Sequence, residues 1–136
     1  IVDYFQEIVY EKPEMTPEER KAVWRDLEKK FRPWMNADGI EYLEEGTRWQ
    51  YQNHIFQSPF YYIDYCIAQT IAFEFLKLSL ENYDNALKTY IAHAKRTGNY
   101  GITDLTKLAG LKSPFEKGAL SEVASFCEEL LSKLSK

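Results

Sequence analysis

The chain has 136 residues, of which 45% are hydrophobic and 28% charged, with 6 glycines and 5 prolines. This composition excludes disordered, collagen-like and fibrous proteins, and the length suits one globular domain that buries about two thirds of its extended-chain surface. The 17 basic and 21 acidic side chains give a net charge of −4. This balance argues against nucleic-acid binding, because phosphate contacts need a concentrated excess of Lys and Arg.

A first helix is predicted from residue 2 to residue 10, because apolar residues recur there at helical spacing. Lys12-Pro13 ends it, since the residue before a proline is pushed out of the helical region. No capping residue precedes this helix and the chain opens without Met. We therefore expect the helix to begin upstream and the chain to be a piece of a longer protein.

Thr16-Pro17-Glu18-Glu19 predicts the start of a second helix, since Thr16 and Glu19 can form a capping box and proline is tolerated in the first turn. Arg32-Pro33 ends it. A short helix is expected at 39–45, and Gly46 is suited to end it in a left-handed conformation.

The stretch 47–57 has no clear period and is expected to be an irregular connection. Ser58-Pro59 then gives the strongest start signal in the chain and predicts a helix from Phe60 to Leu80 that is apolar nearly all round. Such a helix belongs in the middle of a bundle.

Three further helices follow. Asn82 or Asp84 begins the first of them, which Gly98 ends, and Thr103 caps a short one through Ala109. The faces predicted for burial carry Leu87, Tyr90, Ile91 and Ala94 on the first, and Leu120, Val123, Cys127, Leu130, Leu131 and Leu134 on the last. The predicted fold class is an all-α, multi-helix bundle of five to seven helices, with residues 1–136 forming a single helical unit.

The sequence predicts a cytoplasmic protein that binds no membrane, since it shows neither a targeting segment nor an apolar run of bilayer length. Cys66 and Cys127 lie far apart in apolar helical contexts without metal-site spacing. We expect both to be reduced and buried.

The usual catalytic motifs are absent, including His-Glu-x-x-His, and the chain has only two histidines. His93 is expected to be a surface residue. His54 precedes a helix start that carries Tyr61, Tyr62 and Tyr65, and the offset of three predicts that Tyr62 and Tyr65 share a helical face. Such donors suit an oxyanion site, although spacing by itself favours the simpler interpretation that the rings are core.

The stretch Arg48-Trp49-Gln50-Tyr51-Gln52-Asn53-His54-Ile55-Phe56-Gln57-Ser58-Pro59-Phe60-Tyr61-Tyr62-Ile63-Asp64-Tyr65 and its continuation to Gln69 resembles the C-terminal part of oligoendopeptidase F, a zinc peptidase type in the thimet oligopeptidase family. Thr16 to Arg20, Val23-Trp24 and Tyr42-Leu43-Glu44 resemble the same group. The resemblance covers most of the chain and implies an all-helical catalytic lobe around a deep cleft.

The resemblance also implies the site residues. A histidine and tyrosines of this family bind the substrate carbonyl opposite the zinc, and by motif position these are His54, Tyr62 and Tyr65. Tyr61 is assigned to packing or a secondary substrate contact, and Asn53 to substrate binding, although glycine is typical of its position in the family.

The zinc motif of the family is missing from this sequence, so its ligands are expected in an upstream lobe. The isolated chain is then expected to lack both zinc and peptidase activity. Its implied partners are an oligopeptide substrate, the missing N-terminal lobe, and a second copy bound through the exposed apolar face. The alternative is a non-catalytic helical domain that binds a peptide or partner helix through the Trp49 to Tyr65 patch.

Overall fold

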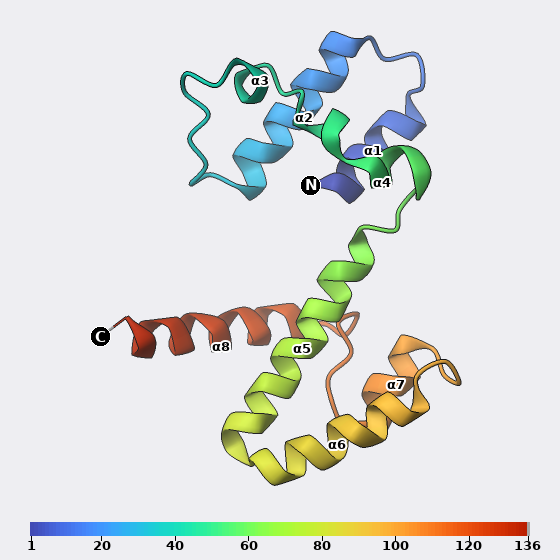
Figure 1. Cartoon of the computed structure of the whole chain (residues 1–136), viewed down its shortest axis with the longest axis vertical. Helices are drawn as coiled ribbons and strands as arrows, with labels where there is room; N and C mark the ends of the chain where they lie inside the picture. Colours follow the sequence, from blue (N-terminus) through green and yellow to red (C-terminus); the bar gives the residue numbers. More distant parts are fainter. Residues whose placement is uncertain (136) are drawn as a thin grey trace. The chain divides into compact units, whose positions relative to one another are not determined.

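The computed structural model describes residues 1–135, and over these residues it is all-α with no strand (Figure 1). This confirms the predicted fold class. The helices are α1 (Val2–Glu11), α2 (Pro17–Phe31), α3 (Glu41–Glu44), η1 of 3-10 type (Arg48–Tyr51), α4 (Asn53–Gln57), α5 (Ile63–Glu81), α6 (Tyr83–Arg96), α7 (Ile102–Leu108) and α8 (Ala119–Leu134). The predicted number of helices was too low, because 47–57 forms two short helices rather than an irregular connection.

The chain divides into two compact units, Ile1–Asp64 (unit 1) and Tyr65–Lys136 (unit 2). The single helical unit expected from the sequence stays a prediction.

Unit 1 is built on an aromatic core. Phe5 of α1 meets Trp24 of α2 edge to face, with ring centroids 5.3 Å apart, and lies 5.2 Å from the ring of Trp49 in η1. Such pairs contribute about 1 kcal/mol each beyond the area that they bury. Val2, Leu27 and Ile55 complete the cluster, so α1, α2 and the 48–57 segment share one core.

The predicted helix ends of unit 1 are confirmed. Thr16 Oγ1 accepts from the Glu19 N–H at 3.2 Å, and Glu19 Oε2 accepts from the Thr16 N–H at 2.7 Å, which is a complete capping box. Lys12 and Arg32 are the C-terminal caps of α1 and α2. Gly46 follows α3 in the left-handed region, with φ of +75°.

The predicted start of the long helix was wrong. Ser58 is the C-terminal cap of α4, where its N–H donates to the His54 carbonyl at 3.0 Å, and α5 begins only at Ile63. The interruption is Phe60, whose φ of +58° lies in the left-handed region. A bulky side chain is rarely found there, so the sequence pattern did not reveal the break.

Unit 2 contains the remaining helices. Asn82 caps α6 by accepting from the Asn85 N–H at 3.1 Å. The predicted cap at Thr103 was wrong, since α7 begins at Ile102 after Gly101 and Thr103 lies inside it. Both cysteines are free, but the expected burial of Cys66 was wrong because this side chain is exposed. The small core of the unit contains Ile71, Ala86, Leu105, Ala119 and Val123.

Candidate active-site segment

His54 lies on α4, a helix of five residues that the core of unit 1 holds in place. Ile55, the next residue, is buried in the cluster with Phe5 and Trp49. The backbone then leaves the helix at Ser58 and reverses through Phe60. After this turn, the residues seven and eight positions beyond His54 contact its ring.

Two tyrosine rings contact the His54 imidazole. The ring of Tyr61 stacks on it almost in parallel, with centroids 5.8 Å apart and planes at 5°. The ring of Tyr62 meets it edge-on, with centroids 5.0 Å apart and planes at 74°. His54 is therefore enclosed on two sides by phenols, one against its face and the other at its edge.

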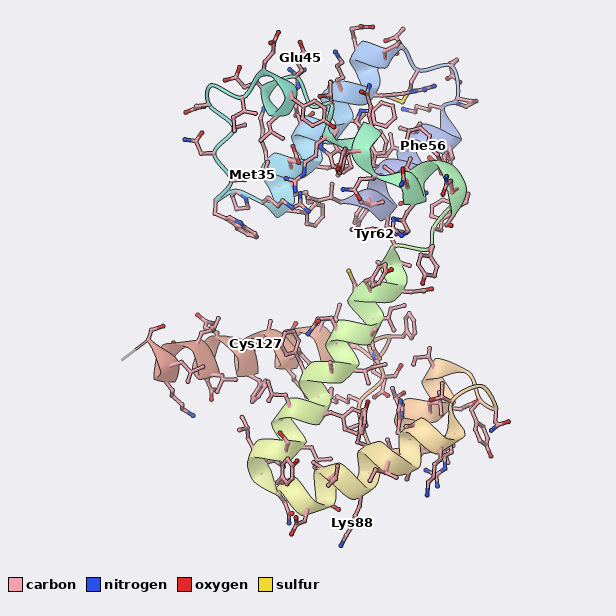
Figure 2. The ribbon with its side chains drawn as sticks, in the orientation of Figure 1. Met35, Glu45, Phe56, Tyr62, Lys88 and Cys127 are labelled. Atoms are coloured by element: carbon pink, nitrogen blue, oxygen red, sulfur yellow. The ribbon has the colours of Figure 1, made fainter. Side chains whose placement is uncertain are left out.

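The other predicted site residues are divided between the two units. Tyr62 is half-buried against the core of unit 1, and Figure 2 labels it in the turn that precedes α5. Tyr65 lies in the first turn of α5, within unit 2, and is 53% exposed. Asn53 is the exposed first residue of α4. Because Tyr62 precedes α5, the offset of three does not place Tyr62 and Tyr65 on a regular helical face.

Sequence reasoning missed the closeness of Tyr61 to His54. The signal for it is the Ser58-Pro59 pair, since proline offers no N–H to continue α4 and forces the chain to turn. Interpreted as a helix start, the same pair favours Tyr62 and Tyr65 instead. Tyr61 is the residue that stacks on the imidazole.

This arrangement offers neutral hydrogen-bond donors beside an imidazole. A phenol donates one O–H, and a neutral imidazole donates from one nitrogen and accepts at the other. Groups of this kind bind a carbonyl oxygen, and they bind it more strongly as it becomes an oxyanion. The chemistry available to the segment is therefore the binding and polarisation of a carbonyl.

A separate cavity of about 800 Å³ in unit 1 lies between α2 and the loop that follows it. Its buried carboxylate, Glu28, forms ion pairs with Arg32 at 3.6 Å and Arg48 at 3.9 Å. Asp26 pairs with Lys29 at 3.9 Å, and Glu44 Oε1 accepts from the Gly39 N–H at 2.7 Å. Glu28 Oε1 is buried and has no hydrogen-bond partner beside these two longer ion pairs, and none of the predicted site residues lines the cavity.

Residues 1–135 contain neither a metal-binding cluster nor a membrane span. No group of three or more His, Cys, Asp or Glu side chains in this range is arranged to hold a metal ion. No helix in this part of the chain is both long and apolar enough to cross a membrane.

Comparison with known proteins finds relatives among solved structures. No protein-family model matches the chain, and no curated protein matches it. A 3.1 Å X-ray structure of an oligoendopeptidase F is 46% identical over 96% of this chain, with a TM-score of 0.91. PZ peptidase A, solved with an inhibitor, is 45% identical over 97% of the chain, also with a TM-score of 0.91. An oligoendopeptidase F from Bacillus anthracis is 36% identical over 97%, with a TM-score of 0.74.

The match covers nearly all of this chain but only a part of each relative. The chain covers 23%, 24% and 20% of these three structures, so it spans between a fifth and a quarter of their length. Identity at this level, extending over almost all of the 136 residues together with the fold, relates the segment to peptidases. Over the segment that it spans, the chain shares its sequence and fold with oligoendopeptidase F structures.

Proposed function

We propose that this chain is the C-terminal catalytic segment of a zinc-dependent endopeptidase that hydrolyses oligopeptides. Within it, His54, Tyr62 and Tyr65 bind the substrate carbonyl and stabilise the oxyanion that forms on it. The observation that carries the proposal is the enclosure of His54 by two phenols, 5.0 and 5.8 Å away between centroids, in a segment related to peptidases.

The metal of such an enzyme does not fit the residues of this chain. The only histidines are His54 and His93, which belong to different units, and residues 1–135 hold no cluster of three or more ligand side chains. Zinc would therefore be held by the rest of the polypeptide, and the isolated 136-residue chain would bind no zinc and cleave no peptide. The remainder of the same peptidase is the partner that the proposal requires.

The contribution of this segment is donor chemistry. A donor aimed at the developing oxyanion lowers the barrier by about 3 kcal/mol, because the bond strengthens as charge builds on the oxygen. His54 and Tyr62 fill this role from unit 1, with Tyr61 holding the imidazole plane by stacking. Tyr65 enters by its motif position, and Asn53, exposed beside His54, is a contact for the substrate backbone.

The test is Tyr65→Phe in the intact peptidase, where only the hydroxyl is lost. We expect kcat to fall at least about tenfold, as loss of one oxyanion donor requires, with the zinc content unchanged. Tyr83→Phe is the matched control, since Tyr83 is an exposed residue at the start of α6. Wild-type turnover in Tyr65→Phe would contradict the assignment.

A non-catalytic binding role is the second candidate. Tyr51 and Phe56 are 84% and 61% exposed, so the segment offers aromatic surface to a peptide or helix. Trp49 does not belong to this surface, because it is buried in the core of unit 1. A His-Glu-x-x-His motif in the coding sequence that flanks the chain would favour the peptidase, and its absence would favour the binding domain.

We place the peptidase in the cytoplasm as part of the same proposal. Both Cys66 and Cys127 are free thiols, as is usual for proteins of reducing compartments.

A further inference from the structure

The carbonyl of Ile55 has lost its helical partner. In an α-helix it would accept from the N–H four residues later, but that residue is Pro59, which has none. The N–H of Ser58 is already used, since it donates to the His54 carbonyl at 3.0 Å. The short helix that carries His54 therefore has a backbone acceptor that must be satisfied from elsewhere.

Tyr10 of α1 satisfies it. The Tyr10 hydroxyl donates to the Ile55 carbonyl at 2.6 Å, across 45 residues of sequence. The hydroxyl itself accepts from Gln6 Nε2 at 3.2 Å. The Tyr10 hydroxyl thus accepts one hydrogen bond from Gln6, and it donates its single proton to the Ile55 carbonyl.

Gln6 is an unusual residue for this place. It is fully buried, next in sequence to Phe5 of the aromatic core, and its Oε1 has no hydrogen-bond partner. A buried amide oxygen without a partner destabilises the fold, so the presence of Gln6 at this position calls for an explanation. Its contact with the Tyr10 hydroxyl is the explanation that the structure offers.

Tyr10 also contacts the other end of the turn. Its ring meets the ring of Phe60 edge to face, with centroids 5.5 Å apart and planes at 89°. Phe60 is the residue in the left-handed conformation that brings Tyr61 and Tyr62 back over His54. One side chain thus holds the carbonyl next to His54 by its hydroxyl and the reversing residue by its ring.

We propose that Tyr10 is a positioning residue for the active site, held in orientation by Gln6, and that it fixes His54 against Tyr61 and Tyr62. This inference rests on the proposed function, since it assigns Tyr10 to the same oxyanion site. Tyr10 contacts the backbone and Phe60 rather than the substrate, so it acts through the placement of His54.

The first test is kinetic and uses the intact peptidase. Tyr10→Phe keeps the ring against Phe60 and removes the hydroxyl, with its bonds to the Ile55 carbonyl and to Gln6 Nε2. Misplacing a catalytic group lowers the rate of the chemical step, so we expect kcat to fall about tenfold while KM stays within about twofold. Tyr4→Phe on the same helix is the control and should leave both constants unchanged, because Tyr4 is exposed and stacks on Phe31 through its ring.

The second test does not depend on catalysis. The 136-residue chain has two histidines, so its NMR spectrum contains two imidazole Hε1 signals. In Tyr10→Phe the signal of His54 should move, because its shift depends on the stacked ring of Tyr61. The signal of His93 in unit 2 should stay in place, and the fluorescence of the buried Trp24 and Trp49 reports whether unit 1 of the variant is folded. Gln6→Met, which keeps the side-chain shape but loses the donor, should move the His54 signal in the same direction.

The outcomes separate the inference from the proposed function. An unmoved His54 signal in both variants overturns the inference, whatever the activity. A moved signal with wild-type kcat also overturns it, because His54 would then not need Tyr10 for catalysis. A moved signal with reduced kcat and unchanged KM supports it. If the intact wild-type protein cleaves no peptide, the proposed function fails, and the catalytic role of Tyr10 fails with it, even where the NMR result holds.

Discussion

At the scale of single residues, Gly46 is the position at which a methyl group should be most damaging. Its φ is +75°, and a Cβ there would lie 2.4 Å from the Lys21 carbonyl oxygen and 2.7 Å from Arg25 Cγ. The Lys21 carbonyl is backbone of α2 and cannot swing away. Gly46→Ala therefore adds a steric clash to the strain of the left-handed conformation, and we expect it to destabilise unit 1 by about 3 kcal/mol.

Gly39 provides the matched comparison. Its φ is +77°, but nothing lies within 4 Å of the position that a Cβ would occupy. Gly39→Ala should therefore cost only the conformational strain, about 1 kcal/mol. Denaturant unfolding followed by tryptophan fluorescence measures both, since Trp24, Trp34 and Trp49 all lie in unit 1. Equal destabilisation by the two variants would contradict the close approach of Gly46 to α2.

Phe60 marks the limit of prediction at this scale. The left-handed conformation of Gly46 could be predicted because glycine is the usual residue at such a helix end, and its φ in the structure is positive. Phe60 adopts a similar φ without any such signal in the sequence. Pro59 marks the end of α4, but the pattern Ser58-Pro59 also predicts a helix start, and nothing in it indicates the left-handed conformation of Phe60.

At the scale of secondary-structure elements, α2 depends on its capping box. Thr16→Ala removes the side-chain acceptor and should destabilise unit 1 by about 1 kcal/mol. The box also makes stability depend on pH. The backbone N–H of Thr16, together with its side chain, lowers the pKa of Glu19 below its ordinary value. A lowered pKa means that the folded state favours the charged carboxylate.

The sign of the pH effect follows from this shift. The contribution of Glu19 to the free energy of unfolding is complete at neutral pH. It is lost as the pH falls below about 4.3, the ordinary value for Glu, and through the lowered pKa of Glu19 in the folded protein. Glu19→Gln keeps a side chain that can close the box but does not titrate, so it should flatten this pH dependence. Glu18→Gln, which removes the neighbouring carboxylate and leaves the capping box intact, is the control. If the stability of the wild-type and Glu19→Gln chains fell in the same way at acid pH, the assignment of this pH dependence to Glu19 would be contradicted.

The difference between α2 and α5 explains which elements could be predicted. The start of α2 is encoded within four residues, Thr16 to Glu19, whose contacts are all local. The start of α5 is delayed by Phe60, which packs against Tyr10 from a distant part of the chain. Local caps are visible in a sequence, whereas a turn stabilised by tertiary contacts is not.

At the scale of the whole molecule, the chain exposes more surface than its mass requires. Its accessible surface is 9739 Å², whereas a compact monomer of 16.0 kDa exposes about 7,400 Å² and two separate compact halves about 8,900 Å². This total exceeds even the surface of two separate compact halves. It agrees with a segment that spans between a fifth and a quarter of its relatives.

Much of this surface is apolar, and α6 shows it most clearly. Leu87 and Ile91 were predicted to face a core, yet each is 44% exposed. A shallow groove of about 260 Å³ lies beside Leu87 between α5 and α6, lined by Phe75, Leu76 and Tyr90 among others. The amphipathic pattern predicted the helix correctly, but the sequence of one segment carries no information on what covers its apolar face.

The uncovered face of α6 should make the isolated 136-residue chain associate. Exposed apolar patches drive association, so the chain should form dimers or larger species as its concentration rises.

Replacing both Leu87 and Ile91 with Glu puts two charges on the patch and should shift sedimentation-velocity profiles toward the monomer. Lys88→Glu is the control, because Lys88 lies between them in sequence on the outward side of α6 and its replacement leaves the apolar face intact (Figure 2). A wild-type chain that stays monomeric at all concentrations would contradict the prediction. If the double variant associates as strongly as the wild type, other exposed side chains, such as Leu131 and Leu134 of α8, are responsible for the association.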